Sequence, residues 1–287
     1  MARRRQGKTR TKGTANKDGN PAQGEASVSG WKAARTWLAG IVSAVLIAAI
    51  GVVFTAWYTA SGTDAVDSIG GAPPLTIGHV AADLRERPLV LREPVTGPQD
   101  RATLLGKAVD DADVAAVLAR HHVATIGDMN VTVVLTGNRS SLRIIDVRPR
   151  VLLRAPPADG ALLRQGTAGE VGTVELVADL DRRPIHFAAK KDPRTAYFTK
   201  KQIDLKRDER VTLSLSITGK SAYYEFDLVA TVLAGDQSEQ VVINGPGGVP
   251  FRLTGPADSY RSTYSRLETG GWAPASTDQV CTAVVAC

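Results

Sequence analysis

The segments RVTLSLSIT (residues 210–218) and YYEFDLVATVL (residues 223–233) decide the fold class of this chain. In both, apolar side chains occupy every second position, and in the first segment serine or threonine fills most positions between them. This period of two is typical of a β-strand that buries one face and exposes the other. The face expected to meet solvent in the second segment carries Tyr223, Glu225 and Asp227. Gly219 and Lys220 stand between the segments and favour a turn.

Other segments repeat this alternation, most clearly MNVTVVLT (129–136) and TVELVADL (173–180). We expect each to form a half-buried antiparallel strand. Further strand candidates lie at 142–154, 185–189, 195–199, 238–243 and 250–254. Seven or eight short strands in about 130 residues are typical of an immunoglobulin-like β-sandwich, which we predict for residues 128–256. The Cys–Trp–Cys arrangement of many such domains is absent from the sequence, and a jelly roll or a partly open barrel would give the same pattern.

The regions on either side of the predicted sandwich are less regular. We expect one or two strands in residues 75–93 and a short helix in DDADVAAVLARHH (110–122), where apolar residues recur at helical spacing. Residues 75–127 therefore form a strand and helix extension in this interpretation. Residues 257–287 show no period, and we expect them to be a C-terminal tail.

The two cysteines of the chain, Cys281 and Cys287, both lie in this tail. Outside a cell such a pair can oxidise, and no other thiol in the sequence competes for either partner. Closing so small a loop would add about 2 kcal/mol of stability if the geometry allows the bond. We therefore predict a disulfide between them, with two free thiols as the alternative.

The sequence WLAGIVSAVLIAAIGVVFTAWY (37–58) is the one long, strongly apolar and uncharged stretch. As a helix it would span about 33 Å, enough to cross a hydrocarbon core of about 30 Å. Trp37 stands at its beginning and Trp57 and Tyr58 at its end, and such amphipathic rings favour the level of the lipid headgroups. We predict a single transmembrane helix over residues 36–59. A cleavable signal peptide is the alternative, since small residues follow the apolar stretch.

Charge orients this predicted span. Residues 1–35 carry nine basic and two acidic residues, whereas residues 36–287 carry 26 basic and 27 acidic ones. Positive charge beside a first span stays in the cytoplasm, so we expect a cytoplasmic N-terminal tail, a stalk at residues 60–74 and an extracellular C-terminal domain at the cell membrane. The tail is too polar to bury a core and should be disordered. It can contact anionic lipid headgroups; because it has no aromatic residue in its first 30 positions, we expect no nucleic-acid partner.

The sequence contains no nucleophile elbow, zinc-binding helix motif or glycine-rich phosphate loop. Its four histidines are scattered, and the adjacent pair His121 and His122 points in different directions on a helix, so it cannot grip one metal ion. The carboxylates that distant strands could bring together are Asp146, Asp179, Asp181 and Asp227. Nothing in their spacing requires such pairing. We therefore expect no cofactor, no metal ion and no catalytic centre.

The loop 189–209 concentrates basic residues around the aromatic pair Tyr197 and Phe198. The residues that we expect to form an anionic-ligand surface are Lys190, Lys191, Arg194, Lys200 and Lys201. An envelope polymer or a protein partner with acidic groups would fit such a surface. The alternative is that these lysines only protect an exposed strand edge from pairing with other chains.

Four segments carry a resemblance to a known group of proteins: VTVVLTGNRSSLRIIDVRPRVLLRAPP (131–157), VELVADLD (174–181), YFTKKQIDLKRDE (197–209) and GVPFRLTG (248–255). In these segments the chain resembles uncharacterised actinobacterial single-pass membrane proteins with a small β-rich extracellular domain. The resemblance covers about residues 75–255 and implies topology and fold, because its motifs are strand and turn signatures rather than catalytic ones.

Three functions are consistent with these observations. The leading hypothesis is a membrane-anchored, extracellular and non-enzymatic module that presents its β-domain to an envelope polymer or a partner protein. The second is an envelope hydrolase that uses carboxylates. The third is a membrane-bound regulator that acts through its basic cytoplasmic tail.

Overall fold

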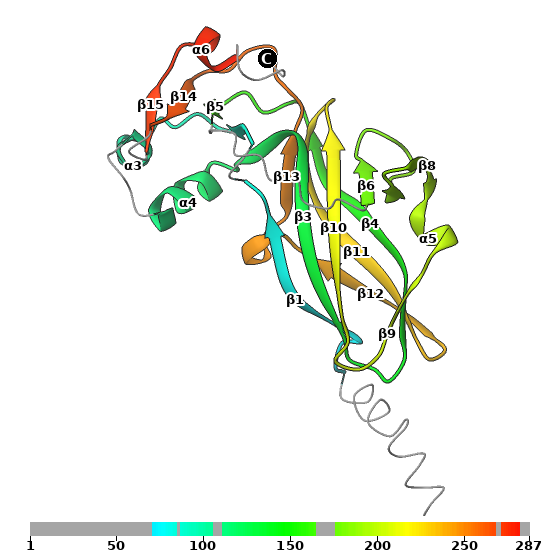
Figure 1. Cartoon of the computed structure of the whole chain (residues 1–287). Helices are drawn as coiled ribbons and strands as arrows, with labels where there is room; N and C mark the ends of the chain where they lie inside the picture. The colour runs from blue at the N-terminus through cyan, green and yellow to red at the C-terminus, as the bar shows by residue number, and fades with distance from the viewer. Residues whose placement is uncertain (1–70, 85–86, 106–110, 165–175, 268–270, 282–287) are drawn as a thin grey trace, which may run out of the picture. The chain divides into compact units, whose positions relative to one another are not determined.

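The computed structural model describes residues 71–84, 87–105, 111–164, 176–267 and 271–281, all of which belong to one compact unit, Trp57–Cys287. The predicted cytoplasmic tail, the transmembrane helix and most of the stalk lie outside the described residues, as do Trp37, Trp57, Tyr58 and Cys287. Within the described ranges, no helix is long and apolar enough to cross a membrane. This part of the chain is mainly β, as predicted, and long strands dominate it (Figure 1).

The first group of strands is arranged around β3 (Ala124–Gly137), which lies between β1 (Leu75–Ala82) and β10 (Arg210–Gly219). Both of these pairings are antiparallel. Beyond β10 follow β6 (Leu176–Asp179), β7 (Ala188–Ala189) and β8 (Asp192–Ala196). Strand β6 runs parallel to β10, so the prediction of an antiparallel strand at 173–180 is wrong for this pairing. The alternation of apolar residues reports which face is buried and contains no information on strand direction.

The second group of strands is arranged around β11 (Tyr223–Ala234). One edge of β11 pairs along its whole length with β4 (Leu142–Ala155). Its other edge pairs with β12 (Gln237–Ile243) and β13 (Phe251–Thr254), which a short helix, η2 (Pro246–Gly248), connects. Strand β9 (Ile203–Leu205) pairs with the far edge of β4. Because β13 also pairs in parallel with the first residues of β3, the two groups belong to one large mixed sheet.

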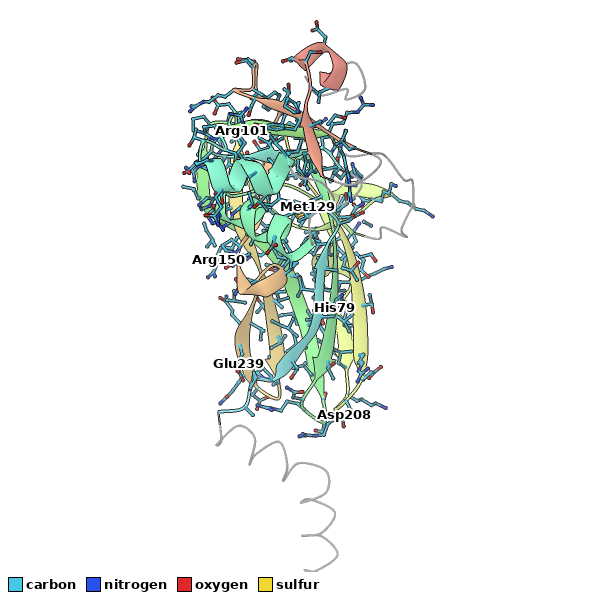
Figure 2. All side chains as sticks on the ribbon, turned by 90° about the vertical axis from the view of Figure 1, so that its left-hand side faces the viewer. His79, Arg101, Met129, Arg150, Asp208 and Glu239 are labelled. Carbon is cyan, nitrogen blue, oxygen red and sulfur yellow. The ribbon has the colours of Figure 1, made fainter. Side chains whose placement is uncertain are left out.

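The two groups of strands enclose one hydrophobic core. The side chains that the three clearest segments bury in this core are Met129, Val131, Val133, Leu135, Leu213, Leu215, Ile217, Tyr224, Phe226, Leu228, Ala230 and Val232, and the partly buried Val211 packs against them. These are the apolar positions of the alternating pattern, which is therefore confirmed. Phe226 stacks on Phe251 of β13 with 5.4 Å between the ring centroids. Met129 lies high on the long strands and Asp208 at their lower tip (Figure 2).

Two residues of β11 that the sequence places on the solvent face are buried. Tyr223 is 0% exposed and Asp227 is 2% exposed. Tyr223 belongs to a second hydrophobic cluster, together with Val90 and Leu162, while Asp227 is covered by a double hydrogen bond from Arg150 of β4. A period of two identifies the inner face of a strand, but it does not show whether another layer covers the outer face.

A smaller part of the sheet extends beyond the first residues of β3. It consists of β2 (Leu89–Leu91), β5 (Ala161–Arg164), β14 (Thr263–Arg266) and β15 (Trp272–Pro274). Helices α3 (Pro98–Leu105) and α4 (Asp111–Arg120) contribute to the cluster on one face, and α6 (Thr277–Cys281) contributes to the cluster on the other. Leu89 and Leu91 belong to the cluster that α3 and α4 complete, whereas Val90 belongs to the cluster that contains Tyr223 and that α6 completes. Both faces of β2 are therefore covered.

Several local predictions can be compared with these elements. Strands β1 and β2 confirm the strands expected in 75–93, and α4 confirms the helix expected in 110–122. The candidate strand at 195–199 is only partly right, because β8 ends at Ala196 and helix α5 (Tyr197–Lys200) follows at once. The described part of the predicted C-terminal tail contains β14, β15 and α6. Strands of three or four residues are too short to show a period in the sequence.

Candidate functional site

A pocket of about 380 Å³ lies where β6, β8 and β10 approach the loop between β6 and β7. Its lining residues are Val177, Ala178, Asp179, Arg182, Pro184, His186, Pro193, Arg194 and Thr218. The first three belong to β6, Thr218 belongs to β10, and Pro193 and Arg194 belong to β8. Strands β6 and β8 and helix α5 stand together on one side of the sheet (Figure 1). The pocket therefore combines an apolar wall with several ionisable side chains.

The one carboxylate in the lining, Asp179, already has partners for both oxygens. Its Oδ2 lies 3.2 Å from Nε of Arg182, and its Oδ1 accepts a hydrogen bond of 3.0 Å from the backbone N–H of Asp181. A carboxylate bound in this way positions the arginine and closes the turn after β6. The Arg182–Asp179 pair is neutral as a unit.

His186 presents one ring nitrogen to the protein. Its Nδ1 lies 3.1 Å from the carbonyl oxygen of Pro184, so Nδ1 carries the hydrogen and donates it to that oxygen. This leaves Nε2 for other partners. The carboxyl group of Asp146, on β4, lies within electrostatic range of His186. Burial raises the pKa of Asp146, and the charges of Arg148 and His186 oppose this rise.

Arg194 is the cation of the pocket that lacks a counter-charge. Its side chain is exposed at the pocket wall, and among the residues that the structure describes no carboxylate forms an ion pair with it. A guanidinium group carries five N–H donors and stays charged at any physiological pH. Because Arg182 and Asp179 compensate each other, Arg194 gives the pocket a net positive charge. This arrangement suits a ligand that carries a small anionic group next to an apolar group.

The other four residues of the predicted anionic-ligand surface do not line the pocket. Lys190 and Lys191 are exposed on the turn between β7 and β8. Lys200 forms an ion pair with Asp192, with 3.3 Å between Nζ and Oδ2. Lys201 lies over the ring of Tyr197, with Nζ 5.7 Å from the centroid. The structure thus brings Arg194 to a pocket and leaves the four lysines on the surrounding surface.

The remaining carboxylates that the sequence singled out have structural partners. Asp181 accepts hydrogen bonds from the backbone N–H of Lys220 at 2.7 Å and from the hydroxyl of Tyr224 at 2.5 Å, and also from the hydroxyl of Ser221. These bonds tie the loop after β6 to the turn between β10 and β11. Asp227 accepts the double hydrogen bond from Arg150 described above. Among the four candidates, Asp179 alone lines the pocket.

The histidine pair His121 and His122 follows directly after α4, and each imidazole lies beside a carboxylate. Nε2 of His121 is 3.0 Å from Oδ2 of Asp100 on α3, and Nδ1 of His122 is 3.4 Å from Oε1 of Glu225 on β11. The pair thus connects the two helices with the main sheet. No group of three or more His, Cys, Asp or Glu side chains that could hold a metal ion occurs in the described residues.

Glu225 is the centre of a partly buried polar cluster on the outer face of β11. Its Oε1 accepts hydrogen bonds from the hydroxyl of Tyr223 at 2.9 Å and from Nε of Arg252 at 3.1 Å. Burial raises the pKa of Glu225, but the bonds from Tyr223, Arg252 and His122 outweigh this effect and lower it below its usual value. Arg92 lies over the ring of Tyr223, 5.0 Å from its centroid. This cluster fixes the smaller part of the sheet against β11.

Sequence reasoning missed Arg182, Pro184 and Thr218 as members of the site and did not link His186 to Arg194. The run LDRRPIH (180–186) contained a signal, since two arginines and a histidine flank a proline directly after a predicted strand. No protein-family model, curated protein or solved structure matches this chain. The resemblance to actinobacterial single-pass proteins therefore stays a prediction.

Proposed function

We propose that this chain is a non-enzymatic binding module that holds an anionic group of an envelope polymer or of a partner protein. The observation that carries the proposal is the guanidinium of Arg194, which has no ion-pair partner among the described residues, in a pocket that also contains the imidazole of His186. A cation beside an apolar wall binds an anion more strongly than an equally charged side chain in open water, because the wall excludes solvent from the contact.

The single carboxylate of the pocket lining speaks against the alternative of a hydrolase that uses two carboxylates. The lining contains one carboxylate, Asp179, which is paired with Arg182 and closes the turn after β6 through a backbone N–H. Glycosidases need two carboxyl groups on either side of the scissile bond, and the lining of this pocket has one.

The proposed setting is extracellular. In this proposal residues 36–59 anchor the chain as a single span, the basic tail stays in the cytoplasm beside anionic lipid headgroups, and the β-domain is an immunoglobulin-like sandwich. Two groups of strands around one core support the sandwich, while the parallel pairs β6–β10 and β13–β3 depart from the antiparallel pattern of such domains. Protease treatment of intact cells with an accessible envelope should remove the β-domain and spare an N-terminal tag. Loss of the tag instead would reverse the topology.

The binding proposal is tested with the full-length protein and a purified anionic envelope polymer in a sedimentation assay. Arg194→Ala should reduce the bound fraction at least fivefold. Arg101→Ala is the matched control, because Arg101 is also an exposed arginine but lies on α3 and does not line the pocket. Equal losses for the two variants would mean that the interaction depends on overall charge, and the pocket would then not be the binding site.

A further inference from the structure

Building on the proposed function, we infer that the pocket recognises the carboxyl-terminal end of a peptide whose last residues have small apolar side chains. The inference concerns the class of the ligand and rests on the donors, the charges and the apolar wall of the same site.

The charges of the pocket favour a single negative charge. The guanidinium of Arg194 is the one lining group that is both cationic and uncompensated in the described residues. Because Asp179 is paired with Arg182, the lining carries one net positive charge, which a ligand with one negative charge neutralises. A terminal carboxylate has one charge and two coplanar oxygens that match the planar fork of an arginine. A phosphate group with nearly two charges fits this balance less well.

Part of the pocket lining is apolar. It is formed by Val177 and Ala178 of β6 together with Pro184 and Pro193. Ala178 is almost fully buried and packs into the main hydrophobic core, so it is the side chain of Val177, on the other face of β6, that supplies apolar surface to the pocket. At about 380 Å³ the pocket is near the lower end of the range of about 300–1,000 Å³ that is usual for small-ligand sites. This space suits the last one or two residues of a peptide with small side chains rather than a sugar polymer.

The edge strand β8 limits the ways in which such a peptide can bind beside the pocket. Strand β8 is the last strand on its side of the sheet among the described residues, and its pairing with β7 is irregular. Pro193 has no N–H, so it interrupts the ladder of backbone hydrogen bonds that an extended peptide would form along β8. The ligand therefore presents its end to the pocket. Thr218 donates its hydroxyl hydrogen to the carbonyl oxygen of Ala178 at 3.3 Å, which leaves its oxygen as an acceptor for a peptide N–H.

The test compares three probes on the full-length protein by isothermal titration calorimetry: N-acetyl-Ala-Ala, the same dipeptide as its C-terminal amide, and inorganic phosphate. We expect the free acid to bind at least tenfold more tightly than the amide and than phosphate. Arg194→Ala and Arg194→Gln should each weaken binding of the acid at least tenfold, and Arg101→Ala should leave its dissociation constant unchanged. Because Arg194 is exposed, neither variant at this position threatens the fold.

The outcomes separate the inference from the function on which it rests. Equal binding of acid and amide, or tighter binding of phosphate, would overturn the inference. If phosphate binding still depended on Arg194 in that case, the anion-binding function would stand with a different ligand. If Arg194→Ala changed the binding of neither the acid nor phosphate, both the inference and the proposed function would be wrong.

Discussion

The pair of Arg150 and Asp227 tests how burial controls the stability of this fold. Two hydrogen bonds join the side chains, 3.0 Å from Nε to Oδ1 and 2.6 Å from Nη2 to Oδ2. The side chain of Asp227 is 3% exposed, whereas that of Arg150 is 49% exposed. Removing one partner of a buried pair costs about 3–5 kcal/mol, because the other charge stays buried without compensation.

The unequal burial predicts unequal costs. Arg150→Ala leaves a buried carboxylate alone and should lower the free energy of unfolding by about 3 kcal/mol, at the low end because water reaches the space of the lost guanidinium. Asp227→Ala leaves an arginine that water can solvate and should cost about 1–2 kcal/mol, the loss of its charge-assisted hydrogen bonds. The double variant should be more stable than Arg150→Ala alone and close to Asp227→Ala.

The measurement is urea unfolding of a fragment that begins at Asp64. We expect this fragment to be soluble and to give a β-dominated far-UV circular dichroism spectrum, because the strongly apolar stretch 37–58 has been removed. Equal costs for the two single variants, or a larger cost for Asp227→Ala, would refute the argument from burial. A chiefly helical spectrum would contradict the fold itself.

Three further predictions concern acid, glycine and thiols. Because the pKa of Glu225 is lowered in the fold, its contribution to stability is present above the usual carboxyl range and is lost as the pH falls; Glu225→Gln should therefore flatten the decrease of Tm between about pH 5 and pH 2. Gly255→Ala should lower Tm strongly, because a Cβ at this position would lie 2.0 Å from a backbone oxygen. Gly78→Ala is the control: a Cβ there would lie 3.5 Å from its nearest atom, so this variant should change the free energy of unfolding by less than about 0.5 kcal/mol. Protein from its native envelope should resist alkylation at Cys281 and Cys287 until it is reduced, and immediate labelling of both would contradict the predicted disulfide.

The strands of this protein are predictable because the signal for each is local. The side chains from Met129 to Leu135 and from Tyr224 to Val232 alternate in the sequence, and the structure buries the same positions. The partners of the strands are not local, and for this reason the parallel pairing of β6 with β10 was missed. The burial of Tyr223 was missed for a related reason, since the cluster that covers it includes Val90 and Val280, which lie far away in the sequence.

The candidate site shows the same division between local and distant information. Arg194 could be singled out because it stands in a basic run, but the same run also suggested Lys200 and Lys201, which have a carboxylate and an aromatic ring as local partners. The count of basic residues therefore overstates the surface that is free to bind an anion. What distinguishes Arg194 is a wall supplied by β6, β10 and the loop that contains Pro184 and His186. An exposed lysine on the β7–β8 turn keeps its hydration shell when it meets an anion and contributes little to binding. A guanidinium beside an apolar wall exchanges part of that shell for fixed partners, so affinity in this domain should depend on the position of one arginine rather than on the number of basic residues around it.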